Sequence, residues 1–239
     1  MGAQPPGAAI GRLLPPSPGL SPGRPLTEGE RRLAHEVFGP SLDAGAVRIT
    51  RDSLLAVVSA TSVCNRINLR SDHGHFAGDG LDLAPGMDAT LVHELVHCWQ
   101  YQHGGVAYMA ESLRAQGLAM LLGRTRRGAY DWRAAEARGR PWHRWNPEQQ
   151  AQCIEDWWQA SRSGFRVTPA QHQAIALVRA GRGAARRSLA GGVAGVLLAA
   201  PPGALIGLAW GPDGALAGAA AAGLLLGLGL GVARPFRRR

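Results

Sequence analysis

The chain has 239 residues, 46% of them hydrophobic, so it can form one sizeable folded domain and an appendage but not two full domains. The formal net charge is +9, and all 26 basic residues are arginines. Because these arginines form no stripe interleaved with aromatic residues, we do not expect nucleic acid binding. The three cysteines lie at no metal or disulfide spacing, so we expect neither a disulfide framework nor a Cys-rich zinc site.

The N-terminal residues 1–26 are rich in Pro and Gly and are expected to form a disordered arm. They contain no charged region followed by an apolar one, so we expect no signal peptide. A folded domain is expected over residues 27–181. It begins with Thr27-Glu28-Gly29-Glu30, which has the form of a capping box and predicts a helix that stops at Gly39-Pro40.

Short strands are expected next, because residues 47–50 and 65–69 alternate apolar and polar side chains. Gly, Asp and Pro punctuate residues 73–86 as in a loop. Four helical stretches follow: one from Asp88 to about His103, with Leu91, Leu95, Cys98 and Trp99 on one side, one over 106–122, one starting at Asn146-Pro147 after a polar Arg/Trp linker, and one from Thr168 to about Ala180. The pattern predicts an α+β fold with a small, partly antiparallel sheet ahead of a helical subdomain.

The composition changes after Ser188. Residues 188–233 are Gly/Ala-rich and apolar, with Asp213 as the one charge, and are expected to form a two-helix transmembrane hairpin with a turn at 211–214. Residues 234–239 form a basic tail. Arginines flank both ends of the hairpin, so the positive-inside rule predicts a membrane-associated chain with its folded domain over residues 27–181 in the cytoplasm.

The sequence His93-Glu94-Leu95-Val96-His97 is the strongest chemical signal, since chance would produce such a match only about 0.01 times in this chain. Residues four apart lie on one face of a helix, so His93 and His97 can bind one zinc ion, Zn²⁺. Glu94, about 100° round the helix, lies where a general base must be to take a proton from a water activated by the metal.

A third protein ligand must come from elsewhere, and Glu148 is favoured. It lies in the first turn of the helix that starts at Asn146-Pro147, where small Ala151 allows close packing against the motif helix. The alternatives are Glu111, Glu155 and the loop pair His73 and His75.

Other polar residues near the motif have weaker claims. Cys98 is expected to face the core as a buried free thiol and not to act as a nucleophile. Four residues are candidates for stabilising a negatively charged reaction intermediate, although packing or surface positions are more usual for these residue types: Tyr101, Tyr108, His103 and His143.

Taken together, residues 26–160 resemble the zincin-like metallopeptidases associated with Rhs and Vgr proteins of type VI secretion and related contractile injection systems. Four blocks carry the resemblance: residues 26–30 with 37–39, residues 47–49, residues 90–100 and residues 147–151. The resemblance implies a zincin-like fold, zinc on His93 and His97, Glu94 as the catalytic base and Glu148 as the third ligand. It also implies export by a dedicated secretion system and contacts with secretion-apparatus proteins.

The expected function is zinc-dependent hydrolysis of peptide bonds. One alternative is a membrane-active effector or structural component of an injection apparatus with a degenerate zincin domain. Another is a membrane-tethered binding module whose zinc is structural and is closed by a fourth ligand, His73 or His75.

Overall fold

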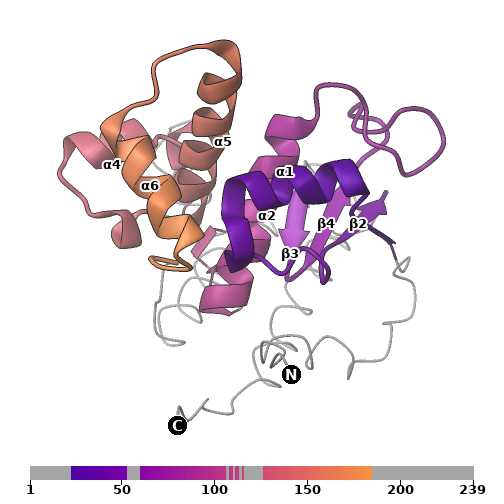
Figure 1. Ribbon diagram of the computed structural model, residues 1–239, viewed down its shortest axis with the longest axis horizontal. Coiled ribbons are helices and arrows are strands. Elements are labelled where there is room, and N and C mark those ends of the chain that lie inside the picture. Colours follow the sequence, from indigo (N-terminus) through magenta and orange to yellow (C-terminus); the bar gives the residue numbers. More distant parts are fainter. Residues whose placement is uncertain are drawn as a thin grey trace, which may run out of the picture.

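The computed structural model describes residues 23–52, 60–105, 108–109, 111–112, 115 and 126–184. In this part of the chain the elements, with η for a 3-10 helix, are β1 (Arg24–Pro25), α1 (Glu28–Phe38), η2 (Gly39–Ser41), β2 (Arg48–Arg51), β3 (Thr61–Val63), β4 (Arg66–Leu69), α2 (Asp88–Gly104), η3 (Arg126–Ala129), α4 (Trp132–Ala137), η4 (Trp142–Arg144), α5 (Pro147–Ser163) and α6 (Pro169–Arg179). Helix α2 runs between the sheet and the helices α4, α5 and α6 (Figure 1).

The sheet has the strand order β1-β2-β4-β3. Strands β2 and β4 are parallel, whereas β1 and β3 pair antiparallel with their neighbours. Ile49 of β2 pairs with Ile67 of β4, and both side chains are fully buried. These strands are the two predicted from alternation, so the α+β class and the small, partly antiparallel sheet are confirmed. The short edge strand β3 was not predicted.

The prediction of a disordered arm over residues 1–26 is wrong at its C-terminal end. Arg24–Pro25 form β1 on the edge of β2, and Leu26 is buried. The Arg24 guanidinium donates to both carboxylate oxygens of Glu30 in α1 and to the Leu81 carbonyl, which fastens this segment to the domain. The pairing was missed because it depends on contacts distant in sequence. Residues 1–22 lie outside the described residues.

Local capping signals determine where three helices begin. Thr27 caps α1 and Thr168 caps α6, each in a reciprocal capping box, as predicted. Asn146 caps α5 with Gln149 and is followed by Pro147 at the first helical position, which confirms the predicted start.

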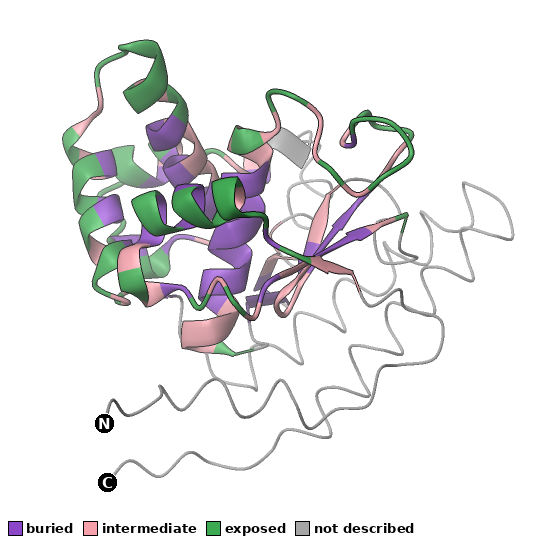
Figure 2. Ribbon diagram, turned by 45° about the vertical axis from the view of Figure 1, so that its right-hand side comes forward, coloured by how far each residue is buried: buried purple, intermediate pink, exposed green. Residues whose placement is uncertain are grey.

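Helix α2 differs from the prediction of a single apolar side. Every residue from Leu91 to Gln100 is buried, because α5 packs on one side of the helix while β3 and β4 pack on the other. Figure 2 shows this continuous buried stretch in the middle of the molecule. The motif helix is therefore the shared core of the sheet and the helical subdomain.

The predicted polar linker between the motif helix and α5 is, from Arg126 onward, also part of the core. It forms η3, α4 and η4, and it contributes three buried tryptophans that pack together. The Trp145 ring centroid lies 5.9 Å from that of Trp132 and 5.3 Å from that of Trp142.

The remaining predictions concern segments that the structure describes only in part. In the helix expected over 106–122, the described residues 108, 109, 111, 112 and 115 are all helical. The predicted hairpin over 188–233 and the basic tail over 234–239 lie outside the described residues. Across the described ranges, no helix is both long enough and apolar enough to cross a membrane.

Candidate metal centre

Three side chains from α2 and α5 converge on one point. His93 Nε2 lies 3.4 Å from Glu148 Oε2, and His97 Nε2 lies 3.6 Å from the same oxygen. The three ligand atoms are all within 4.8 Å of one another, and each side chain is buried. The structure thus brings together the three predicted ligands His93, His97 and Glu148, which we call the metal triad.

The geometry of α2 and the cap of α5 place the three side chains of the metal triad close together. His93 and His97 lie one turn apart on α2, with ring centroids 5.1 Å apart. Glu148 lies in the first turn of α5, two residues after the Asn146 cap. Ala151, one turn further along α5, is fully buried, as expected from close packing of the two helices.

The second nitrogen of each histidine ring also has a hydrogen-bond partner. His93 Nδ1 lies 2.9 Å from Glu155 Oε2, and His97 Nδ1 lies 2.8 Å from Gln100 Oε1. An ionised carboxylate and an amide oxygen can only accept, so each Nδ1 carries a proton. A neutral ring protonated at Nδ1 has its lone pair on Nε2, the nitrogen that faces Glu148.

The three side chains of the metal triad also shift one another's pKa values. Burial disfavours a charge on His93, but hydrogen bonds to Glu148 and Glu155 outweigh it and raise the pKa of His93 to about 10. Burial also opposes a charge on His97, yet the Glu148 carboxylate raises its pKa. Burial would raise the pKa of Glu148, but His97 and His93 hold it well below its usual value. The metal triad therefore favours positive charge next to Glu148, which protons or a metal cation can supply.

Glu94, the predicted catalytic residue, lies on α2 beside the metal triad and is buried. Its carboxylate raises the pKa values of both His93 and His97, which places its charge near the triad. The Ser62 hydroxyl of β3 lies 2.7 Å from Glu94 Oε2 and 3.1 Å from the Glu94 carbonyl oxygen. The edge strand thus orients the carboxylate.

Two tyrosines flank the histidine rings. Tyr108 stacks on His97 with ring centroids 5.9 Å apart, and its hydroxyl donates to the Ser62 carbonyl and accepts from the Cys64 amide. The Tyr130 ring centroid lies 5.8 Å from that of His93. Tyr108, one of the predicted candidates for stabilising an intermediate, is therefore held against the backbone of β3.

The alternative ligands predicted from the sequence do not belong to the metal triad. Among the described residues, the group that could hold a metal ion consists of the metal triad and includes none of the following: Glu111, Glu155, His73 and His75. Glu111 is nevertheless buried. His75 Nδ1 accepts from the Arg70 amide in the loop before α2, and the His73 and His75 rings contact each other edge to face.

The other predicted candidates also have assigned positions. Cys98 is fully buried, and burial raises the pKa of its thiol, as expected for a core thiol that is not a nucleophile. Tyr101 lies beside Cys64, and His103 Nε2 contacts the Ser41 carbonyl at 2.7 Å. His143 is exposed on η4.

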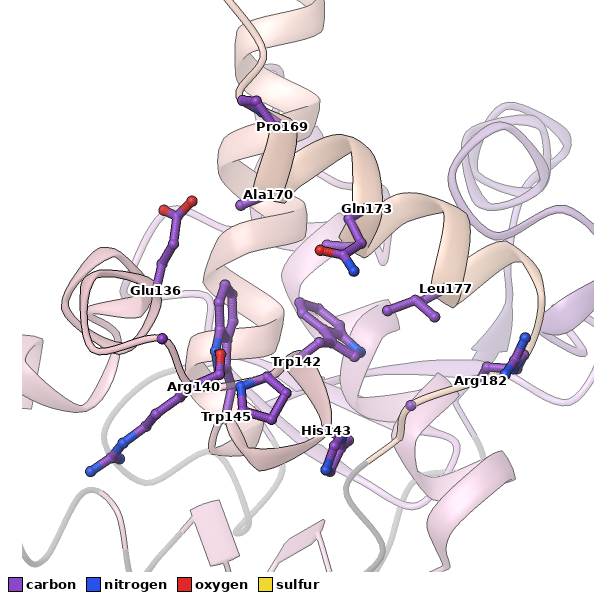
Figure 3. Close-up of a pocket in the computed structure, with 14 residues that line it drawn as sticks. Glu136, Arg140, Trp142, His143, Trp145, Pro169, Ala170, Gln173, Leu177 and Arg182 are labelled. Atoms are coloured by element: carbon purple, nitrogen blue, oxygen red, sulfur yellow. The ribbon is translucent and has the colours of Figure 1, made fainter.

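A separate cavity of about 640 Å³ lies between α4, η4 and α6. Figure 3 shows its aromatic wall, formed by Trp142 and Trp145, facing Leu177 of α6. No member of the metal triad lines this cavity.

Sequence reasoning missed Gln100 and Ser62, which support the site, and it considered Glu155 only as an alternative metal ligand and not as the partner of His93 Nδ1. Gln100 follows His97 by three positions and Glu155 follows Glu148 by seven, so helical spacing could have placed each on the same face as a ligand. Ser62 had no such signal, because it reaches Glu94 only through packing of the unpredicted β3 against α2.

The chain matches no protein-family model and no solved structure. Over 155 residues it is 30% identical to the type VI secretion system spike protein VgrG2b of Pseudomonas aeruginosa. The aligned region covers 62% of this chain but 14% of that protein, so the chain corresponds to a small part of its relative.

Proposed function

We propose that the chain is a zinc-dependent metallopeptidase in which the metal triad holds one zinc ion and Glu94 is the general base. One observation carries the proposal. His93 Nε2 and His97 Nε2 approach the same Glu148 oxygen at 3.4 and 3.6 Å, while the opposite nitrogen of each ring is occupied by a hydrogen-bond partner.

The donor set fits zinc. Two imidazole nitrogens and one carboxylate oxygen are ligands that Zn²⁺ accepts, and catalytic zinc sites use three protein ligands whereas structural sites use four. In the described residues the group contains three ligands, which favours a catalytic site over the closed structural site of the alternative interpretation.

Each residue then has a defined role in peptide hydrolysis. When bound, zinc activates a water molecule near neutral pH and polarises the scissile carbonyl. Glu94 accepts the proton of the attacking water and passes it to the leaving amine, while the Ser62 hydroxyl keeps its carboxylate oriented. Glu155 and Gln100 hold the histidine rings so that their Nε2 atoms point into the site.

The similarity to a spike protein of a type VI secretion system supports a proposal about partners. We propose that the chain acts together with secretion-apparatus proteins and is delivered by such a system. The membrane hairpin over residues 188–233 would then attach the catalytic domain to a membrane. A membrane-active or structural component with a degenerate site remains the competing function.

The test uses the purified full chain loaded with zinc and a peptide library as substrate. Inductively coupled plasma mass spectrometry should find one zinc per chain, and the library should be cleaved. Glu94→Gln should keep the zinc and lose hydrolysis by about 10²- to 10⁴-fold, because the ligands survive and only the proton acceptor is lost.

Glu28→Gln is the matched control, since Glu28 is an exposed carboxylate on α1. It should keep both zinc and activity. Zinc bound without any cleavage, or equal cleavage by Glu94→Gln and the wild type, would favour the degenerate-site interpretation over the peptidase.

A further inference from the structure

We infer that Gln100 and Gln150 are positioning residues that form a hydrogen-bond relay and orient the His97 ring for metal binding. The inference rests on the proposed metal site and extends it to two buried amides that do not touch the metal. It also connects that site to the segment of chain that follows α6.

The relay begins at the ring nitrogen of His97 that faces away from Glu148. Gln100 Oε1 lies 2.8 Å from His97 Nδ1. Gln100 Nε2 donates to the Pro147 carbonyl at 3.1 Å and to Gln150 Oε1 at 3.0 Å. One amide therefore joins the motif helix to the first turn of α5.

Gln150 continues the relay to two backbone carbonyls. Its Nε2 donates to the Trp142 carbonyl at 3.0 Å and to the Gly183 carbonyl at 3.1 Å. Since carbonyl oxygens can only accept, the amide of Gln150 has one favourable orientation, with its NH₂ group toward these carbonyls and its oxygen toward Gln100.

The orientation of Gln150 in turn fixes that of Gln100 and of the His97 ring. Gln150 Oε1 and the Pro147 carbonyl both require the NH₂ group of Gln100, which leaves the Gln100 oxygen for His97. His97 must then donate from Nδ1, and its Nε2 lone pair points toward Glu148. The ring orientation at the site thus follows from carbonyls at the far end of the relay.

Burial makes the relay costly to break. Gln100 is 1% exposed and Gln150 is fully buried, so water cannot readily replace a lost partner. His93 is oriented differently, by the carboxylate of Glu155. The neutral amide at position 100 accepts from His97 without adding a fourth carboxylate to Glu94, Glu148 and Glu155.

The far end of the relay depends on a glycine. Gly183 has a φ of +82°, and a Cβ there would lie 2.6 Å from Trp142 Cδ1. A residue without a side chain is therefore needed to bring this carbonyl next to Gln150. Trp142 and Gly183 also line the separate cavity shown in Figure 3.

The test measures zinc affinity of full-chain variants by competition with a chelator. Gln100→Leu should weaken zinc binding about 10- to 100-fold, the usual effect of losing the partner of a metal-bound histidine. Gln150→Leu should weaken it less, since Gln100 still donates to the Pro147 carbonyl. Gln100→Glu should bind zinc more tightly than Gln100→Leu, because a carboxylate oxygen again accepts from His97 Nδ1.

Gln171→Leu is the matched control, since Gln171 is a buried glutamine of α6 whose Oε1 accepts from the amide of the capping residue Thr168. It should bind zinc like the wild type. Nitrogen-15 NMR of the zinc-loaded chains adds a readout that a general loss of stability would not produce. A slowly exchanging proton on His97 Nδ1 should appear in the wild type and Gln171→Leu but not in Gln100→Leu.

The possible outcomes distinguish a failure of the relay from a failure of the proposed metallopeptidase function. Wild-type protein that binds no zinc would overturn the proposed function. Zinc bound equally by wild type, Gln100→Leu and Gln150→Leu would overturn the relay alone, as would a proton on His97 Nε2. If Gln100→Leu does not fold, Gln150→Leu provides the test, because it leaves Gln100 and His97 unchanged.

Discussion

His93 lies between two carboxylates, with Nδ1 2.9 Å from Glu155 Oε2 and Nε2 3.4 Å from Glu148 Oε2. The two glutamates are seven residues apart on α5, which is nearly two turns, so one helix face supplies both. Glu148 occupies the side on which His97 also converges, and Glu155 holds the opposite side of the ring. The two carboxylates therefore have different roles at one histidine.

This arrangement predicts that Glu155 affects zinc binding without being a ligand. Glu155→Ala should weaken zinc binding about 10- to 100-fold, because His93 Nδ1 loses its acceptor. Glu155→Gln should have a smaller effect, since an amide oxygen can still accept. Competition with a chelator measures the zinc affinity of both variants. Glu136→Ala, which removes an exposed carboxylate of α4, is the control. Unchanged affinity in Glu155→Ala would show that the contact does not orient His93.

Two equally buried glutamates allow a matched test of the third ligand. Glu148 is 3% exposed and Glu111 is 5% exposed, but only Glu148 belongs to the metal triad. Glu148→Ala should lose most bound zinc during gel filtration, whereas Glu111→Ala should retain it, because only a ligand contributes directly to the metal. Equal zinc content in the two variants would remove Glu148 from the site.

Ser62 should matter for turnover and not for metal content. Ser62→Ala removes the hydroxyl 2.7 Å from Glu94 Oε2, so the base loses its orientation while all three ligands remain. We expect one zinc per chain and a fall in kcat of about tenfold, which is less than the 10²- to 10⁴-fold loss expected when the base itself is removed, because the Glu94 carboxylate is still present. Thr61→Ala on the same strand is the control. A loss of zinc in Ser62→Ala would instead indicate a structural role for β3.

The sequence predicted the parts of the site that depend on local spacing. The capping signals at Thr27, Asn146 and Thr168 placed three helices, because a cap acts within one turn. The His93 and His97 pairing followed from helical periodicity in the same way. Glu148 was favoured among several carboxylates from its position at a helix start, and the packing of α2 on α5 brought it to the histidines.

The missed features depend on contacts distant in sequence. Strand β1 has two residues, and β3 has three, which is too short for a recognisable alternation. In the sequence, Gln150 is an ordinary polar residue of a predicted helix. Only the structure shows that its side chain donates to the Trp142 and Gly183 carbonyls. The burial of α2 on all sides likewise follows from having a layer on each face and not from its own sequence pattern.

The Arg24–Glu30 contact predicts a dependence of stability on pH. Burial alone would raise the pKa of Glu30, but hydrogen bonds from Arg24 and the Thr27 amide outweigh it and lower the pKa below 4.5. A lowered pKa in the folded state means that ionised Glu30 stabilises the fold at neutral pH, and this stabilisation is lost as the pH falls through the folded-state pKa.

Glu30→Gln should therefore reduce the free energy of unfolding at neutral pH, and the difference from wild type should shrink in acid. Urea unfolding of the chelator-treated chain measures this without a contribution from metal loss. Glu28→Gln, an exposed carboxylate on the same helix, should show little effect. A difference between Glu30→Gln and wild type that does not change with pH would contradict the assigned pKa shift.

The predicted hairpin over residues 188–233 can be tested in the full chain. We expect the protein to resist carbonate extraction from membranes, because each predicted span approaches the length needed to cross a bilayer. With Arg182 and Arg234 flanking the spans, a cysteine introduced as Asp213→Cys should be labelled from the non-cytoplasmic side. Release by carbonate would refute the hairpin, and labelling from the cytoplasmic side alone would refute its orientation.

Anomalous X-ray diffraction at the zinc edge, from crystals of the zinc-loaded full chain, tests the central claim most directly. The metal triad predicts one strong peak about 2.0 to 2.2 Å from His93 Nε2, His97 Nε2 and a Glu148 carboxylate oxygen, with the Glu94 carboxylate beside it and outside bonding distance. A zinc peak elsewhere, or a zinc ion bonded directly to Glu94, would contradict the account.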